Sequence, residues 1–450
     1  MQVDLDFAKD AYTSYIDADP VGRTYVTDDA VYRIIKKEAY AECLELLHSR
    51  LFKELVSREY FPKTEIFRHD PEKSYLVLKH DRAPFILYPG EWTFSMLKDA
   101  ALRYLDVMQL CHDHGYGLKD GHAYNIVFFH TTPKFVDFGS IVKNGHSAVA
   151  EVEFFDTVAA PLFLWSKKEF WLANLLLSSD LAQYLPVVDR GASFVFRRVS
   201  SLRKNISEKN FWFLCRVSNF VTLRLIGKAL FKASVFDSNK MRRRIIRQKF
   251  PAVATEWMSY GKSLNANVLP RRFQSLIDWL SERQWHSLVD VAGNSGYVVS
   301  LLANRFSGIP MLSADYDSCA ADEWYRKSVS IGGVGAGMLN VFARRDYGIP
   351  VHIRLKADVV LVLAVTHHLF LRQGYSAEKV FTTLDAICGK YLIVEFMPLG
   401  LWDGKIAPIL PDWYSEEWFC GALRESFEIE KREQTEENRI LFVCRKKAGK

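Results

Sequence analysis

The chain has 450 residues, a formal net charge of +6 at pH 7, 49% hydrophobic residues and 25% charged residues. This composition supports two or three folded domains and excludes a mainly disordered, collagen-like or low-complexity chain. The seven cysteines form no Cys-x-x-Cys pair, which is typical of free thiols in a reducing compartment. We find no secretory signal and no uncharged apolar stretch of about 18 residues, so we expect a cytoplasmic protein.

Charge divides the chain into three parts. Residues 197–249 contain 15 Lys or Arg and only 2 Asp or Glu, whereas the remainder is mildly acidic. A shift of this size marks a boundary. We therefore predict a first domain over residues 1–190, a basic and largely helical connector over residues 191–264, and a second domain over residues 265–450.

The first domain contains a pattern that is typical of kinases. Asp120 stands five residues before Asn125, and the sequence DFG begins 12 residues later at Asp137, after a predicted strand. In a kinase the first Asp orients the attacking hydroxyl, while the Asn and the second Asp hold Mg²⁺ on the phosphates of ATP. The segment resembles the second lobe of small-molecule and glycan kinases. This resemblance implies an α+β kinase-like domain with ATP, and with Mg²⁺ held by Asn125 and Asp137.

The ATP-binding part of such a kinase is incomplete in this sequence. No glycine-rich loop is present, since the best candidate, residues 19–23, has one glycine. The candidates for the ATP-binding cation are Arg33, Lys36 and Lys37, and those for its acidic partner are Glu38, Glu42 and Glu45. Without the loop, ATP loses backbone donors that it needs. The first domain is either an active kinase or a degenerate one that positions substrate, and we slightly favour the second.

The basic connector is most highly charged near its end, from Arg242 to Lys249. With the aromatic residues before it, this patch could lie on an anionic membrane, which would place the protein peripherally at the inner membrane. Another polyanion, such as RNA, is a second possible partner, but no RNA-binding module accompanies the patch, so we disfavour nucleic acid. A salt-bridged linker packed on the acidic domains is equally compatible with the sequence.

The second domain alternates short apolar runs with helical patterns, which indicates an α/β fold with a mostly parallel sheet. The predicted helices are residues 273–283 and 297–305, and the predicted strands are residues 287–291, 310–315, 357–365, 391–396, 427–432 and 439–445. The last two strands are expected to form an antiparallel pair that closes the sheet.

A glycine-containing turn follows the first of these strands. Gly293 and Gly296 would let a ligand approach the main chain at a helix N-terminus. Asp290 lies at the end of the strand before the turn, and Asp315 ends the next strand, where a carboxylate can accept both hydroxyls of a ribose. A turn of this kind also often just closes a strand–helix corner. The absence of Gly-x-Gly-x-x-Gly at this turn argues against a dinucleotide.

Three further side chains follow the later strands of the sheet. His367 and His368 come after the strand predicted over residues 357–365, and a His near neutral pKa could take a proton from a sugar hydroxyl. Simple packing is the alternative for both. Glu395 lies at the end of the next strand, where it either orients substrate hydroxyls or serves as a structural acid.

This order of elements resembles the Rossmann-like fold of class I S-adenosylmethionine-dependent methyltransferases. The segments DVAGNSG (290–296), LAVTHHL (363–369), VEFMPLG (394–400) and PDWY (411–414) resemble a bacterial family that includes rhizobial nodulation-associated, NoeA-like methyltransferases. EWTFSMLKDAALRYLDV (91–107) and L-x-D-x4-N (118–125) extend the resemblance into the first domain. It implies a seven-stranded sheet and S-adenosylmethionine held by Asp290, Gly293, Gly296, Asp315 and Asn340. At Asn340, in the adenine-contacting turn, the family usually has Asp.

The resemblance also implies a function. We expect a methyltransferase in polysaccharide biosynthesis that acts on a carbohydrate or surface-glycan precursor, with a glycan or small-molecule acceptor facing His367, His368 and Glu395. One alternative is a bifunctional kinase–methyltransferase that phosphorylates and methylates a glycan end. A second alternative is an RNA-binding methyltransferase, with the basic connector as the tether.

Overall fold

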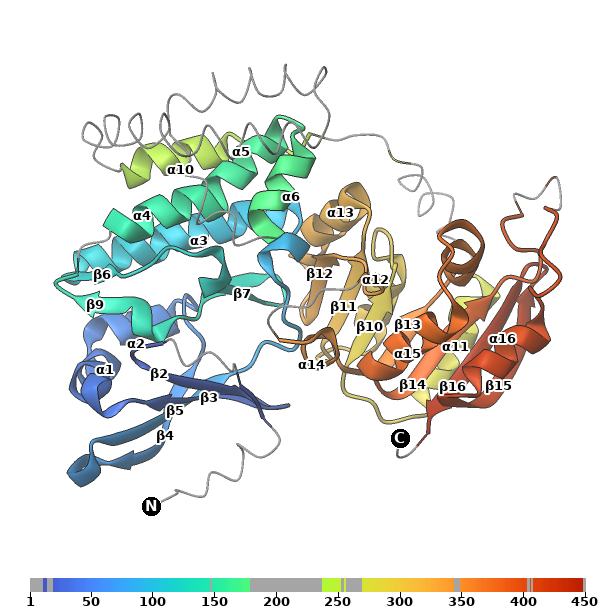
Figure 1. Cartoon of the computed structure of the whole chain (residues 1–450), viewed down its shortest axis with the longest axis horizontal. Coiled ribbons are helices and arrows are strands. Elements are labelled where there is room, and N and C mark those ends of the chain that lie inside the picture. Colours follow the sequence, from blue (N-terminus) through green and yellow to red (C-terminus); the bar gives the residue numbers. More distant parts are fainter. Residues whose placement is uncertain are drawn as a thin grey trace.

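The computed structural model describes residues 11–13, 19–145, 148–178, 237–251, 255, 269–343, 349–402, 405 and 408–447. Two parts lie side by side (Figure 1). We call residues 11–178 the front domain and residues 269–447 the sheet domain, each without its undescribed gaps. Most of the predicted connector, including Arg197 to Phe236, lies outside the described residues, so its largely helical character stays a prediction there.

The front domain begins with an antiparallel sheet of five strands in the order β1-β2-β3-β5-β4 among the described residues. The strands are β1 (Tyr12–Thr13), β2 (Gly22–Val26), β3 (Ala30–Ile35), β4 (Thr64–Asp70) and β5 (Tyr75–Asp81). Two helices, α1 (Tyr40–His48) and α2 (Arg50–Ser57), connect β3 to β4. The Ser49 hydroxyl accepts the N–H of Phe52 and so caps α2.

The rest of the front domain is mainly helical and is built around α3 (Phe94–Asp113), most of whose apolar side chains are buried. The other elements are β6 (Tyr116–Leu118), β7 (Ile126–Phe129), β8 (Thr132–Phe135), β9 (Ile141–Lys143), α4 (Ala148–Phe154), the π-helix η7 (Phe155–Ala159), α5 (Ala160–Ser166) and α6 (Phe170–Ser178). Helix α10 (Ser238–Ile246) packs on α3 through buried Met241 and Ile245. The front domain is therefore α+β, and its kinase-like character stays a prediction.

The sheet domain contains a sheet of seven strands among the described residues, in the order β12-β11-β10-β13-β14-β16-β15. The strands are β10 (Leu288–Val291), β11 (Met311–Asp315), β12 (Val334–Met338), β13 (Ala357–Val362), β14 (Cys388–Phe396), β15 (Phe427–Glu436) and β16 (Arg439–Lys446). The first five in spatial order run parallel, and β16 pairs antiparallel with both β14 and β15. The antiparallel pair predicted at the end of the chain is confirmed.

Helices flank this sheet on both faces, as Figure 1 shows. They are α11 (Arg271–Ser281), α12 (Tyr297–Arg305), α13 (Ser318–Ser328), α14 (Val351–Arg354), the π-helix η10 (His368–Arg372), α15 (Ala377–Ile387) and α16 (Glu416–Leu423). The inner strands β10 and β13 are almost wholly buried, because helices cover both faces of a parallel sheet. Because five strands of the sheet run parallel, their carboxyl ends lie at the same edge of the sheet.

Two sequence predictions for this sheet need correction. The strand predicted over residues 357–365 ends at Val362, because Ala364 has a φ of +54° that breaks the extended backbone. The edge strand β12 was not predicted at all, since its sequence VGAGM carries two glycines and reads as a poor strand. Within the described residues, no helix combines the length and apolar character needed to cross a membrane.

Candidate functional site

The carboxyl ends of the parallel strands surround a cavity of about 610 Å³, which we call the edge cavity. Its wall is built from turns that follow β10, β11, β12, β13 and β14. The lining residues are Ala292, Asn294, Asp315, Tyr316, Asn340, Leu363, Ala364, Val365, His367, His368, Arg372, Gln373, Met397, Leu401, Trp402 and Arg439. Of the eight residues predicted for the site, Asp315, Asn340, His367 and His368 line this wall, and Asp290, Gly293 and Glu395 line a smaller cavity beside it.

The glycine turn after β10 is compact because several residues adopt left-handed backbone conformations. Ala292, Asn294 and Gly296 have φ of +59°, +50° and +70°. A Cβ at Gly293 would lie 2.5 Å from Oδ2 of Asp290, and one at Gly296 would lie 2.0 Å from the Trp324 ring. Both predicted glycines are therefore required sterically, and the turn ends as the N-cap of α12.

Two buried carboxylates lie on either side of this turn. Asp290 is 2% exposed and its Oδ2 has no hydrogen-bond partner. Burial, with a smaller contribution from the charge of Asp315, raises the pKa of Asp290 to about 8. An unpartnered buried carboxylate oxygen is costly, so its presence indicates a site built for a ligand.

Asp315, at the end of β11, is fixed by the main chain. Its Oδ2 accepts the N–H of Asn294 and its Oδ1 accepts the N–H of Asp317, both at 2.8 Å. Burial raises the pKa of Asp315 to about 6, although these backbone hydrogen bonds act in the opposite direction. Each carboxylate oxygen has further lone pairs, so the group can accept two hydroxyl donors.

Asn340 follows β12 and reaches the edge cavity from the other side. Its Oδ1 accepts the N–H of Phe342 at 2.9 Å, which closes the turn, and its Nδ2 donates to the hydroxyl of Tyr375 at 3.4 Å. The amide is thus held in the cavity wall by contacts that leave part of its hydrogen-bonding capacity available, and its predicted contact with the cofactor stays a prediction.

His367 and His368 begin the helix that follows β13, and both line the edge cavity. Their ring centroids are 4.1 Å apart. His367 is 6% exposed, and burial lowers its pKa to about 3, with smaller contributions from His368 and Arg439. His367 is therefore neutral near pH 7 and a weak base, and its Nδ1 is buried without a hydrogen-bond partner. His368 is the less buried of the two.

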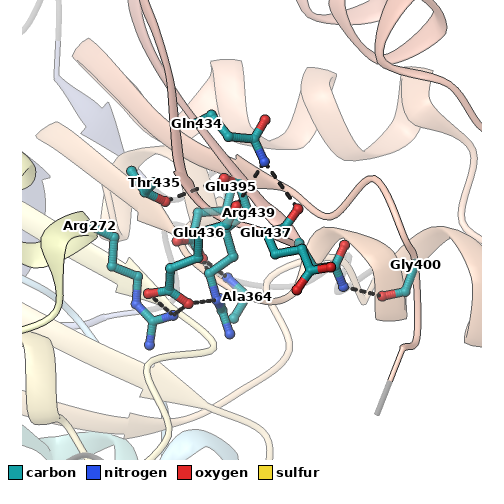
Figure 2. A network of polar contacts seen from close by, with 10 residues as sticks. Arg272, Ala364, Glu395, Gly400, Gln434, Thr435, Glu436, Glu437 and Arg439 are labelled. Carbon is teal, nitrogen blue, oxygen red and sulfur yellow. Dashed lines mark hydrogen bonds and ion pairs between the residues drawn. The ribbon is translucent and has the colours of Figure 1, made fainter. Parts of the chain in front are cut away.

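Glu395 is not in the wall of the edge cavity. It is completely buried, and its Oε2 accepts the N–H of Ala364 at 2.8 Å and the Arg439 guanidinium at 2.9 Å. Figure 2 shows this ion pair within a network that continues through Glu436 to Arg272. Its Oε1 has no partner, and Glu395 lines a small neighbouring cavity of about 60 Å³ together with Asp290. The predicted position in the same crevice as the two histidines is thus corrected to a place beneath it.

Sequence reasoning missed Arg439, and it placed residues 363–365 in a strand although they form a turn in the cavity wall. Arg439 lies at the start of β16, far from the motifs in sequence, and enters the cavity only because β16 pairs with β14. No local pattern could have revealed it. Of the aromatic residues near the cavity, Trp402 lines it, whereas Tyr414 is buried and its hydroxyl donates to the Met397 carbonyl at 3.0 Å.

The three kinase-like residues are also close together, in the front domain. Asn125 Nδ2 donates to Asp120 Oδ1, and burial together with the Asp137 charge raises the pKa of Asp120 to about 6. Arg33 Nη1 lies 3.4 Å from Asp137 Oδ1 and 3.6 Å from Asp19 Oδ2. The structure therefore pairs Arg33 with these two acids and not with a glutamate of α1, which corrects that expectation. Among the described residues there is no group of three or more His, Cys, Asp or Glu arranged to hold a metal.

The described end of the basic connector contains α10, and its basic residues fall into two groups. Arg242 forms an ion pair with Asp106, and the Arg244 guanidinium lies over the ring of Phe163, so both face the front domain. Arg243, Arg247 and Lys249 are exposed. Binding of an anionic membrane or another polyanion to this surface stays a prediction.

Comparisons with known proteins give one relative over most of the chain. The sequence is 23% identical to the nodulation protein NoeA of Rhizobium meliloti strain 1021 over 454 residues, which cover 91% of each protein. No family model matches the chain.

Several solved structures are similar to part of the chain. One is the N-methyltransferase NodS from Bradyrhizobium japonicum WM9, at 14% identity, covering 39% of this chain and 94% of NodS with a TM-score of 0.30. Another is a SAM-dependent methyltransferase from Aquifex aeolicus, at 12% identity, covering 43% and 99% with a TM-score of 0.34.

Proposed function

We propose that this protein is an S-adenosylmethionine-dependent methyltransferase whose cofactor lies in the edge cavity. The observation that carries the proposal is the junction of the glycine turn with Asp315. There a carboxylate fixed by two backbone N–H groups lies beside a turn that has no room for side chains at its glycines. This arrangement suits a nucleoside placed at the carboxyl edge of a parallel sheet.

The residues present fit that cofactor. Asp315 would accept the ribose hydroxyls, and Asn340 would contact the adenine edge, where an amide can both donate and accept. The orphaned Oδ2 of Asp290 and the backbone of the glycine turn would take the charged amino-acid end. When bound, the cofactor supplies an electrophilic methyl group on a sulfonium.

The acceptor would enter beside His367 and His368. A methyl transfer is a direct displacement, so the main task of the protein is to orient the acceptor and exclude water. Neutral His367 can accept a hydrogen bond from an acceptor hydroxyl or amine through Nδ1. His368 is the candidate for proton removal, because it is less buried in the wall of the same cavity.

A carbohydrate or surface-glycan precursor is the acceptor that we propose. The support is the resemblance of the sequence motifs to nodulation-associated methyltransferases, together with Trp402 in the cavity wall, since aromatic side chains are suited to stacking on sugar rings. Glu395 would act indirectly, by holding Ala364 and Arg439 in the wall.

The test is titration calorimetry of the full-length protein with S-adenosylmethionine and with S-adenosylhomocysteine. We expect both to bind, and we expect labelled methyl groups to pass from S-adenosylmethionine into glycan precursors from bacterial membranes. Absence of binding by both nucleosides would reject the proposal. Binding without transfer to any glycan fraction would reject the carbohydrate acceptor alone.

The front domain is a second candidate site, because Asp120, Asn125 and Asp137 are close together there. A bifunctional kinase–methyltransferase would use them on ATP and Mg²⁺. The environment of Arg33 favours the degenerate alternative, since two carboxylates already neutralise the only cation on β3. We therefore propose that the front domain is a kinase-like scaffold.

A further inference from the structure

Helix α13 starts directly behind the turn that carries Asp315, and it is bound to the front domain one turn later. Its N-cap, Asp317, donates its N–H to Asp315. The carboxylate of Asp322 is fully buried and accepts the N–H of Ser95 at 2.7 Å and the Ser95 hydroxyl at 3.1 Å. Ser95 lies in the first turn of α3, so a side chain of the sheet domain caps a helix of the front domain.

A second contact follows on the same face of α13. The hydroxyl of Tyr325 donates to Oδ2 of Asp99 at 2.8 Å and lies 3.2 Å from the carbonyl oxygen of Thr131. The Tyr325 ring is 1% exposed and meets Phe128 edge to face at 6.1 Å. Asp99 and Phe128 come from α3 and β7, so α13 is held by two separate elements of the front domain.

The chain beyond the Asn340 turn is held in the same way. Arg354 of α14 forms a bidentate ion pair with Glu91 at 2.7 and 2.9 Å, and neither residue is more than 2% exposed. Two further N–H groups donate to the Ile86 and Ile349 carbonyls at 2.7 and 2.9 Å. A buried bidentate pair of this kind fixes both position and orientation.

The edge strand β12, which leads into the Asn340 turn, also lies against the front domain. A Cβ at Gly337 would come within 3.1 Å of both methyl groups of Leu87, and one at Gly335 would be 3.6 Å from the carbonyl oxygen of His130. The two glycines thus allow the front domain to approach the backbone of β12. The strand that leads into the Asn340 turn is therefore packed directly against the front domain.

From these contacts we infer that the front domain forms part of the nucleoside-binding half of the cofactor site. It holds α13 and α14, and through them it positions Asp315 and Asn340, so its integrity sets the affinity for the cofactor. Arg354 and Tyr325 are the positioning residues. This inference rests on the proposed function, because the proposed function identifies what the two turns bind.

The experiment compares the full-length protein with two conservative variants, Arg354→Lys and Tyr325→Phe. Lysine keeps the charge but cannot make the bidentate pair, and phenylalanine removes only the hydroxyl. The matched control is Lys390→Met, which breaks an ion pair with Asp358 at 2.9 Å. This pair lies near the amino-terminal ends of β13 and β14, away from the edge cavity at their carboxyl ends. Melting temperatures are recorded for all variants, and affinities are compared well below them.

The experiment measures two quantities, the rate of amide hydrogen exchange and the affinity for a ligand. Amide hydrogen exchange without ligand reports on residues 315–317 and 339–343, and calorimetry gives the affinity for S-adenosylhomocysteine. We expect Arg354→Lys to speed exchange at both turns and to weaken binding about tenfold, and Tyr325→Phe to weaken binding about threefold. Lys390→Met should lower the melting temperature without either effect.

The two readings separate the inference from the proposed function. Unchanged exchange at both turns in Arg354→Lys and Tyr325→Phe, with affinities equal to that of the control, would overturn the inference. Faster exchange in a protein that binds no S-adenosylhomocysteine would keep the positioning role of the front domain and reject the proposed cofactor.

Discussion

Asp315 accepts the backbone N–H of Asn294 at 2.8 Å, and this hydrogen bond joins the acid at the end of β11 to the glycine turn after β10. The carboxylate is therefore oriented before any ligand arrives, which reduces the ordering cost of binding. The same bond explains why two motifs that are 21 residues apart in sequence act as one site.

Replacing Asp315 by Asn should weaken cofactor binding strongly. An amide has one acceptor oxygen where the carboxylate has two, and it loses the charge that strengthens hydrogen bonds to ribose hydroxyls. We expect the affinity for S-adenosylhomocysteine to fall about 10- to 100-fold, since hydrogen bonds to charged groups contribute about 1.5–3 kcal/mol each. Calorimetry measures the loss. The control is Asp385→Asn on α15, which weakens an ion pair with Lys446 of β16. Equal affinities in the two variants would contradict the assignment.

Binding of the nucleoside should depend on pH through the same group. Burial raises the pKa of Asp315 to about 6, so the carboxylate is ionised above this pH and protonated below it. The ionised form is the better acceptor, and affinity should therefore be full above pH 7 and fall as the pH drops through 6. Methylthioadenosine is the suitable probe, because it lacks the amino-acid end that approaches Asp290. An affinity that stays constant between pH 5 and 7 would contradict this prediction.

Asp290 should reduce the stability of the ligand-free protein at high pH. Its pKa rises from 3.8 in the unfolded chain to about 8 in the folded protein, so the folded state binds the extra proton between these values. Stability from this group is full below pH 4 and is lost as the pH rises through 8. Asp290→Asn removes the buried charge, and we expect it to raise the free energy of unfolding by about 1–3 kcal/mol at pH 9 and by less at pH 5. Thermal unfolding at the two pH values measures this difference, and a loss of stability at pH 9 would be the contrary result.

The sequence predicted the central part of the sheet domain well. The helix predicted over residues 297–305 is α12 with the same bounds, and β10, β11 and β14 lie within a few residues of their predictions. These elements have local signals, namely apolar runs that end in an acid or a glycine turn. Asp290 and Asp315 could be located for the same reason, since each lies at the end of such a strand. Asn340 was placed only by the family resemblance, because the strand before it, β12, was not predicted.

The remaining features, namely β12, Arg439 and the burial of Glu395, depend on contacts between segments that are distant in sequence. Gly337 of β12 is explained by the close approach of Leu87, which belongs to the front domain. Arg439 reaches the edge cavity because of strand pairing, and the exact burial of Glu395 depends on Arg439. A single sequence carries no local trace of such partners, and for that reason Glu395 could be read as either a functional or a structural acid.

Glu395→Gln distinguishes these two roles. The substitution leaves the Arg439 guanidinium, which is 13% exposed, beside a neutral amide. We expect a loss of about 1–3 kcal/mol in the free energy of unfolding, because one partner of a buried ion pair has been removed. Glu436, 3.0 Å from Arg439, still neutralises part of its charge in this variant, so adding Arg439→Gln should recover only a small part of this loss. Chemical denaturation measures both, and an unchanged stability would show that the pair is not structural.

The front domain should bind no Mg-ATP. In residues 19–23, the candidate for a glycine-rich loop, the Asp19 side chain accepts the N–H of Val21 at 2.8 Å, so this backbone donor is not available to a phosphate. The Asp19 charge also lies 3.6 Å from Arg33 and would repel the nucleotide. We expect no binding heat at millimolar Mg-ATP and no ATP consumption. Mg²⁺-dependent ATP consumption that disappears in Asp137→Ala, while S-adenosylhomocysteine binding persists, would instead establish the bifunctional enzyme.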